Sequence, residues 1–196
     1  SSEEPAFSYN ERSRTGPSNW GRLDPNWKTC SDGKSQSPIQ FLPQDLHIAP
    51  SLGDLEAAYF QSPATMRSNG HNIMLSWKGN SGKITIGSKD YNLQNFHWHT
   101  PSEHAINGQR FALEHHIVHQ SSNGELAVIA ILYQAGTPDP FLSKLLPSIK
   151  SVTKEEKDLG ILNPTDIEFP SKNYYRYIGS LTTPPCTEEV VWTVFR

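Results

Sequence analysis

The chain has 196 residues, of which 35% are hydrophobic and 10% aromatic, so its composition is that of one globular domain and excludes a disordered or fibrous protein. Seventeen basic against twenty acidic side chains give a formal net charge of -3, without a basic run that could neutralise a phosphate backbone, so nucleic acid is not an expected partner. The longest apolar stretch, residues 126–133, is too short to span a bilayer, which predicts no membrane span.

The hydrophobic pattern predicts strands over most of the chain. Residues 1 to about 50 are rich in Gly, Pro, Ser and Asn and have no sustained period, which predicts an irregular surface arm with short turns. From about residue 57, short apolar or alternating runs recur between turn signals. The predicted strands are 73–77, 83–86, 91–99, 111–119 and 126–133, and residues 174–195 are again strand-like.

One helix is predicted, at residues 139–146. Four apolar side chains there recur at helical spacing, Asp139 stands near the start as a cap, and Pro147 is expected to end the helix. The four are Phe141, Leu142, Leu145 and Leu146. The whole pattern therefore predicts a mainly β domain with an antiparallel or mixed sheet and a few helices.

A cluster of histidines is the strongest chemical signal. Six of the eight histidines are His97, His99, His104, His115, His116 and His119. Because side chains alternate along a strand, His97 and His99 face the same way, whereas the next strand separates His116 from the pair His115 and His119. If the strands pair through the turn at 107–108, either set could complete three nitrogen ligands. Zinc is the favoured metal for such a set, with copper and nickel as alternatives.

Longer motifs surround this cluster. They are Gly-Pro-Ser-Asn-Trp-Gly at 16–21, Gln-Ser-Pro-Ile at 36–39, Asn-Gly-His at 69–71, Phe-His-Trp-His-Thr-Pro-Ser-Glu-His at 96–104, Leu-Glu-His-His-Ile-Val-His at 113–119 and Gly-Ser-Leu-Thr-Thr-Pro-Pro-Cys at 179–186. In order and spacing, the motifs resemble the alpha-class carbonic anhydrases, particularly the plant and algal branch. The resemblance covers nearly the whole chain. It implies a large, twisted, mostly antiparallel sheet with a zinc ion at the bottom of a cone.

The resemblance also implies a function, the reversible hydration of carbon dioxide to bicarbonate and a proton through a zinc-bound hydroxide. The family's Glu-x-His pattern falls on Glu114 and His116, so the implied zinc ligands are His97, His99 and His116. Thr182 and Glu103 match the pair that orients the hydroxide. His71 matches the proton shuttle.

Further family positions have implied roles. Tyr9 and Asn69 match residues that order water between zinc and shuttle, and Glu114 matches a carboxylate that fixes a ligand imidazole. Asn95 stands where glutamine is usual and is one methylene shorter, so its hydrogen bond to His97 is expected to be lost or bridged by water, with weaker zinc retention. The apolar wall that holds carbon dioxide falls on Val118, Val128, Leu181, Val190 and Trp192.

The two cysteines, Cys30 and Cys186, match the disulfide of extracytoplasmic family members. The resemblance therefore implies a secreted, periplasmic or chloroplast-lumen protein. Because the family continues beyond the position of Arg196, the single domain of residues 1–196 is expected to be truncated at its C-terminus. The expected partners are carbon dioxide, bicarbonate and sulfonamide-type inhibitors.

Two other functions are considered. Plant tuber storage proteins look like this family but have lost a zinc ligand, and a catalytically silent storage or binding relative is the alternative to the enzyme. All three ligands, with Glu103, Thr182 and His71, are present here, which favours the enzyme. Ester hydrolysis is expected only as a side activity, because the apolar wall is narrow.

Overall fold

The computed structural model describes residues 6–136, 140–167 and 169–196. A large sheet contains β2 (Glu56–Tyr59), β3 (Ser62–Ser68), β4 (Ile73–Trp77), β5 (Gly82–Ile86), β6 (Lys89–His99), β9 (Leu113–Gln120), β10 (Leu126–Tyr133), β11 (Lys157–Leu162), β12 (Tyr175–Gly179) and β13 (Val190–Phe195). A small sheet contains β1 (Gln40–Phe41), β7 (Ala105–Ile106) and β8 (Gln109–Arg110). The α-helices are α1 (Trp20–Leu23), α2 (Thr29–Asp32) and α3 (Pro140–Lys150), and none of these described helices is long and apolar enough to cross a bilayer.

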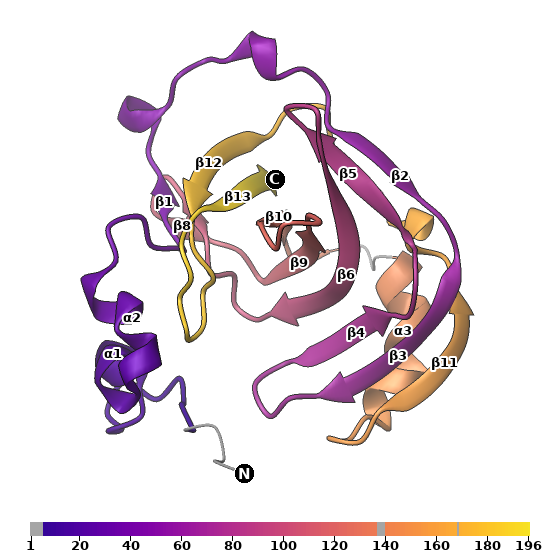
Figure 1. The fold of residues 1–196 in the computed structure, drawn as a ribbon, viewed down its shortest axis with the longest axis horizontal. Coiled ribbons are helices and arrows are strands. Elements are labelled where there is room, and N and C mark those ends of the chain that lie inside the picture. The colour runs from indigo at the N-terminus through magenta and orange to yellow at the C-terminus, as the bar shows by residue number, and fades with distance from the viewer. Residues whose placement is uncertain (1–5, 137–139, 168) are drawn as a thin grey trace.

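The large sheet is strongly curved and mixed (Figure 1). Its strands follow the order β11-β3-β4-β6-β9-β10-β13-β12, with β5 on β6 and β2 on β5. Its neighbours pair antiparallel except for β10 and β13, which run parallel. The mainly β fold with a mostly antiparallel sheet agrees with the prediction.

The N-terminal arm is irregular, as predicted, and one aromatic side chain holds its first part together. Trp20 in α1 is buried, and its indole Nε1 donates to the carbonyl oxygens of Ser8 and Thr15, both at 3.1 Å. The short helices α1 and α2 lie together at one end of the molecule (Figure 1). These bonds hold the first residues of the arm against α1.

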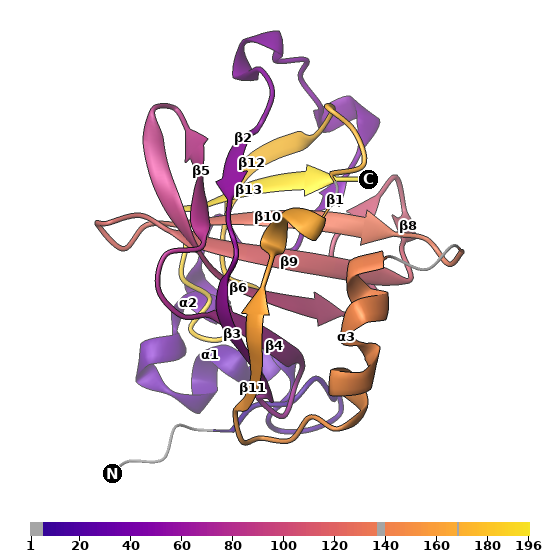
Figure 2. The same ribbon diagram turned by 90° about the vertical axis from the view of Figure 1, so that its right-hand side faces the viewer.

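The two faces of the sheet bury two separate clusters. Along β10, Ala127, Ile129 and Ile131 belong to one apolar cluster, and the alternate residues, which are Val128, Ala130 and Leu132, belong to the other. This is why residues 126–133 read as a continuous apolar run. Helix α3 lies on the first face, beside β11 (Figure 2), and contributes Phe141 and Leu145 to that cluster.

The prediction that Pro147 ends the helix is wrong, because α3 continues to Lys150. A proline at this position removes the hydrogen bond to the carbonyl of Ser143 and its ring crowds that carbonyl. The next turn carries Ile149, which packs against the main core, and this packing holds the helix beyond the proline. The proposed cap, Asp139, and the side chain of Leu146 lie outside the described part of the chain.

Candidate metal centre

The pairing of β6 with β9 resolves the two histidine sets. In this antiparallel pair His97 lies opposite His116 and His99 lies opposite Glu114. Directly opposed residues share a face of the sheet, so His116 joins His97 and His99. His115 lies opposite Trp98 on the other face, where the two rings stack with 4.8 Å between centroids.

His119 lies on the same far face as His115. It bonds to the hydroxyl of Tyr59 at 2.7 Å and to the carbonyl of Ala127 at 3.1 Å. Both of its ring nitrogens are therefore engaged away from the three-histidine set.

The three-histidine set has the geometry of a metal site. One ring nitrogen from each of His97, His99 and His116 lies within 4.8 Å of the others, and Nε2 of His97 is 3.2 Å from Nδ1 of His116. Two ligand nitrogens of a tetrahedral zinc ion stand about 3.3 Å apart. Nε2 of His99 is buried without a hydrogen-bond partner in the described residues, which a bound cation would satisfy. The residues therefore fit a zinc ion.

Neighbouring side chains select which nitrogen faces the centre. Nδ1 of His97 donates to Oδ1 of Asn95 at 3.0 Å, which leaves Nε2 without a proton. Nε2 of His116 contacts the carboxylate of Glu114, which leaves Nδ1 for the centre. Nε2 of His97 and Nδ1 of His116 thus face one another, and a cation between them would bind the unprotonated form of both.

The expectation for Asn95 is therefore wrong, since its hydrogen bond to His97 is direct. Strand β6 has a bulge here, with a register shift between Leu93 and Asn95. A bulge re-aims the neighbouring side chains and so compensates for the shorter side chain. Weaker zinc retention no longer follows from this position.

Burial keeps two of the imidazoles neutral. It lowers the pKa of His97 well below the usual value and that of His99 to about 3, and the neighbouring imidazoles add to both effects. A neutral imidazole is the form that binds a metal at pH 7. Burial acts in the same direction on His116, but the carboxylates of Glu114 and Glu103 together outweigh it and raise the pKa of His116.

Glu114 is itself held by a buried chain of hydrogen bonds that sequence analysis missed. Its carboxylate accepts from the backbone nitrogen of His104 at 2.8 Å and from Nδ1 of the same residue at 2.9 Å. The other ring nitrogen of His104 lies 2.6 Å from the hydroxyl of Tyr177, which lies 2.7 Å from Oγ of Ser37. Tyr177 is on β12, 73 residues beyond His104, and nothing in the sequence connects them.

Glu103 lies against the same centre. Its Oε1 is 3.4 Å from Nε2 of His99 and 3.7 Å from Nε2 of His116. Burial raises the pKa of Glu103 to about 7, although the charge of His116 and a hydrogen bond from Thr182 act against the shift. The expected pair of Thr182 and Glu103 is thus brought together beside the histidines.

A cavity of about 110 Å³ opens above the three histidines. One side of it is apolar, formed by Val118, Val128, Leu181 and Trp192, and the other side carries Asn69, His71 and Asn72. Val190, the fifth residue of the expected wall, is buried in the core cluster that also holds Val128 and Trp192, and it does not line the cavity.

The N-terminal arm supplies aromatic rings at the cavity. The imidazole of His71 stacks on the ring of Phe7, with 4.1 Å between centroids and 15° between planes. The ring of Tyr9 meets His71 edge-on at 5.8 Å. Burial, and next the charge of Glu103, raise the pKa of Tyr9 to about 12, so its hydroxyl keeps its proton at neutral pH. Sequence analysis missed Phe7, which has no motif of its own.

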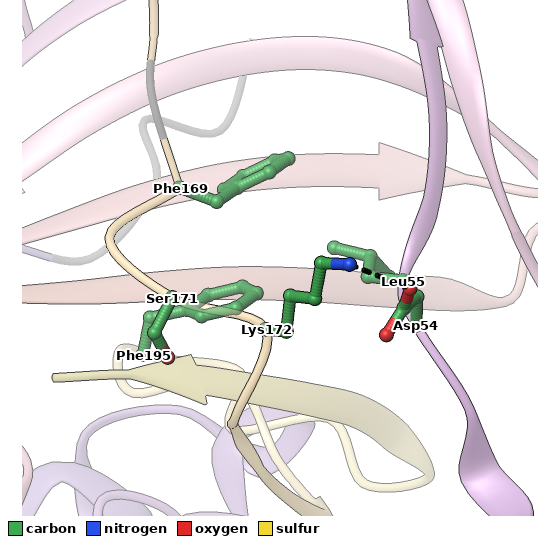
Figure 3. Close-up of a pocket in the computed structure, with 6 residues that line it drawn as sticks. All are labelled: Asp54, Leu55, Phe169, Ser171, Lys172 and Phe195. Carbon is green, nitrogen blue, oxygen red and sulfur yellow. Dashed lines mark ion pairs between the residues drawn. The ribbon is translucent and has the colours of Figure 1, made fainter.

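A wider hollow of about 570 Å³ lies elsewhere, near the end of β13 (Figure 3). Phe169 and Phe195 line it, and Nζ of Lys172 pairs with Asp54 across it at 3.8 Å. Its described lining contains no histidine. The wider hollow therefore does not compete with the three-histidine centre as a metal site.

The two cysteines form a disulfide, as the resemblance implied. The bond joins Cys30 of α2 to Cys186, four residues beyond Thr182. It therefore ties the N-terminal arm to the segment that carries Thr182 into the cavity.

Comparison with known proteins agrees with this geometry. The family model described as eukaryotic-type carbonic anhydrase matches residues 15–196. The chain belongs to this family. Alpha carbonic anhydrase 6 of Arabidopsis thaliana is 51% identical over 190 residues, which cover 97% of this chain and 73% of the relative. The resemblance to plant alpha-class carbonic anhydrases is thereby confirmed.

Solved structures of carbonic anhydrases and related proteins share the fold. A dioscorin complexed with ascorbate superposes with a TM-score of 0.93 at 42% identity, covering 97% of this chain and 81% of the dioscorin. The alpha-carbonic anhydrase from Thermovibrio ammonificans with the inhibitor sulfanilamide gives a TM-score of 0.90 at 34% identity, covering 99% of this chain and 84% of that one.

Proposed function

We propose that this chain is a zinc enzyme that catalyses the reversible hydration of carbon dioxide to bicarbonate and a proton. The observation that carries the proposal is the convergence of three imidazole nitrogens at the floor of a cavity with one apolar wall. A zinc ion bound there would supply a water activated for attack at neutral pH. His97 and His99 would hold it through Nε2, and His116 through Nδ1.

The cavity wall suits a small uncharged substrate. Val118, Val128, Leu181 and Trp192 offer carbon dioxide an apolar surface, and Val190 packs behind them as support. The hydroxyl of Thr182 donates a hydrogen bond to the carboxylate of Glu103. The oxygen of Thr182 can then only accept a hydrogen bond from the nucleophile. This pair orients the attacking oxygen toward the substrate.

The proton released by the reaction must reach bulk solvent. His71 lines the cavity and is also exposed to solvent, so its imidazole is placed to accept a proton inside and release it outside. Tyr9 and Asn69 flank the imidazole and contribute to the water path. Sulfonamide-type inhibitors are expected to bind at the metal, in line with the sulfanilamide complex of the Thermovibrio ammonificans relative.

A binding function without catalysis is the second candidate. It is favoured by the likeness to a dioscorin whose structure is a complex with ascorbate. The presence of all three candidate ligands, together with Glu103, Thr182 and His71, supports the enzyme over the silent relative.

The Cys30–Cys186 disulfide supports a further part of the proposal, which is that residues 1–196 act as one domain in an extracytoplasmic compartment. Secretion, a periplasm and a chloroplast lumen all meet this requirement.

Stopped-flow hydration of carbon dioxide by zinc-loaded protein tests the proposed function. We expect rapid, sulfonamide-sensitive turnover, and we expect the His71→Ala variant to become dependent on the concentration of imidazole buffer. Absence of turnover in folded, zinc-loaded protein would contradict the enzyme and favour the binding function.

A further inference from the structure

The turn that presents His71 occupies the carboxamide oxygen of Asn69. Oδ1 of Asn69 accepts from the backbone nitrogens of His71 at 2.9 Å and of Asn72 at 2.8 Å. The backbone nitrogen of Asn69 donates in turn to the carbonyl of Asn72 at 3.1 Å. The oxygen of Asn69 therefore shapes the turn and is a poor acceptor for water in the cavity, so Asn69 contributes to the water path through its amide nitrogen.

Asn72 closes this turn on the side of the metal ligands. It directly precedes β4, and Asn72 and Met74 both line the cavity while Ile73 packs against the main core. Met74 pairs with His97 across β4 and β6. Two residues along a strand span about 7 Å, so Asn72 lies about 7 Å along the chain from Met74, the residue that faces the ligand His97. It lies on the side of Met74 toward His71.

The carboxamide oxygen of Asn72 is buried and has no hydrogen-bond partner in the described part of the chain. Both backbone groups of Asn72 already bond to Asn69. Buried polar atoms in proteins are almost always satisfied, by protein or by an ordered water. An unsatisfied acceptor on the wall of a cavity is thus a place for a water molecule.

We propose that Oδ1 of Asn72 anchors the water chain between the metal centre and His71, which makes Asn72 a positioning residue for proton transfer. The inference rests on the proposed function. Carbon dioxide has no hydrogen to donate, so an acceptor at this point offers nothing to the substrate, whereas water donates to it. Ordered water here gives the proton a continuous path to the imidazole.

Exchange of ¹⁸O between carbon dioxide and water tests the inference, because mass spectrometry reports separately the interconversion rate and the proton-dependent release of labelled water. The variants are Asn72→Leu, which keeps the size but removes the acceptor, and Asn72→Asp, which keeps an acceptor. Asn123→Leu, at an exposed turn between β9 and β10, is the matched control.

We expect Asn72→Leu to lower the water-release rate about five- to tenfold, as the loss of one hydrogen bond implies, while its interconversion rate matches that of the control. Asn72→Asp retains more of the water-release rate, and imidazole buffer restores it in Asn72→Leu. Asn72→Ala serves as a second variant if the leucine variant does not fold.

Two results would overturn the inference while leaving the proposed function standing. One is a water-release rate in folded Asn72→Leu or Asn72→Ala equal to that of the wild type. The other is an equal fall of both rates, which would place Asn72 in the substrate wall. Absence of any exchange in zinc-loaded wild type would instead overturn the proposed function, and this inference with it.

Discussion

Asn95 shows how a single residue supports the centre. Its carboxamide oxygen lies 3.0 Å from Nδ1 of His97 although the side chain is one methylene shorter than a glutamine. Partners of this kind are typically worth about 10- to 100-fold in metal affinity. We therefore expect Asn95→Ala to weaken zinc binding by about that factor, and Asn95→Gln to bring no gain, because the bond already exists.

Competition with a chromophoric chelator measures both affinities. Unaltered zinc affinity in Asn95→Ala would show that the hydrogen bond contributes nothing. Tighter binding by Asn95→Gln would show that the shorter side chain is a true handicap.

At the same scale, sequence reasoning finds only side chains whose neighbours are close along the chain. His97 and His99 follow from strand alternation, and His116 from a motif on the next strand. The contacts of His104 with Tyr177 and of His71 with Phe7 join segments 73 and 64 residues apart, so they depend on packing that no local pattern encodes.

At the scale of elements, strands were predicted where a short apolar or alternating run lies between turn signals. Strands β4 and β10 have the predicted bounds, and the strands predicted at 83–86, 91–99 and 111–119 differ by one or two residues at their ends. The strand-like stretch 174–195 contains two strands, β12 and β13, with residues 180–189 between them. Strands β2, β3 and β11 of the large sheet and the two-residue strands β1, β7 and β8 were not assigned. Pro63 in β3 is an unfavourable strand residue, and Gly160 in β11 has a φ of 69° beside a register shift, which interrupts the alternation.

Helix α3 gives a prediction at this scale. Pro147 is exposed within the helix, and an interior proline costs a helix about 3 kcal/mol. Part of that cost is offset because proline also restricts the unfolded chain, by about 0.4–1 kcal/mol. We expect Pro147→Ala to raise the free energy of unfolding by about 2 kcal/mol in urea titrations.

Ser143→Ala, at an exposed position of the same helix, is the control and should give no more than about 0.5 kcal/mol. A Pro147→Ala variant no more stable than this control would mean that the helix is already broken at the proline.

At the scale of the whole molecule, the disulfide is the longest covalent constraint. Cys30 and Cys186 are separated by 156 residues, and closing a loop of this length removes unfolded-chain entropy worth about 5 kcal/mol. We expect reduction, or replacement of both cysteines by serine, to lower the free energy of unfolding by about 3–5 kcal/mol. Equal urea midpoints for oxidised and reduced wild type would contradict this.

Buried histidines make the metal-free protein sensitive to acid. Burial lowers the pKa of His99 and His115 to about 3 and that of His119 to about 4, and that of His97 also falls. The unfolded chain takes up these protons near pH 6.5 but the folded protein does not, so stability falls as the pH drops from about 6.5 toward 4. Glu103 has the opposite effect because its pKa is raised to about 7. Between pH 7 and about 4.5 the folded protein holds one proton on Glu103 that the unfolded chain releases, so this residue adds stability as the pH falls.

Each net proton contributes about 1.4 kcal/mol per pH unit. Urea unfolding of chelator-treated protein at pH 7 and pH 5 measures the slope, and His115→Phe should reduce it by one proton. A stability that is the same at both pH values would mean that the imidazoles titrate freely in the folded state.

Zinc titration of metal-free protein, followed by carbon dioxide hydration at each step, tests the central claim most directly. The matched variants are His116→Ala, which removes a candidate ligand, and His115→Gln, which alters the adjacent buried histidine on the opposite face. We predict that wild type and His115→Gln bind one zinc ion and gain activity in proportion to it, whereas His116→Ala gains neither. Stoichiometric zinc in folded wild type without hydration, or full activity in His116→Ala, would contradict the account.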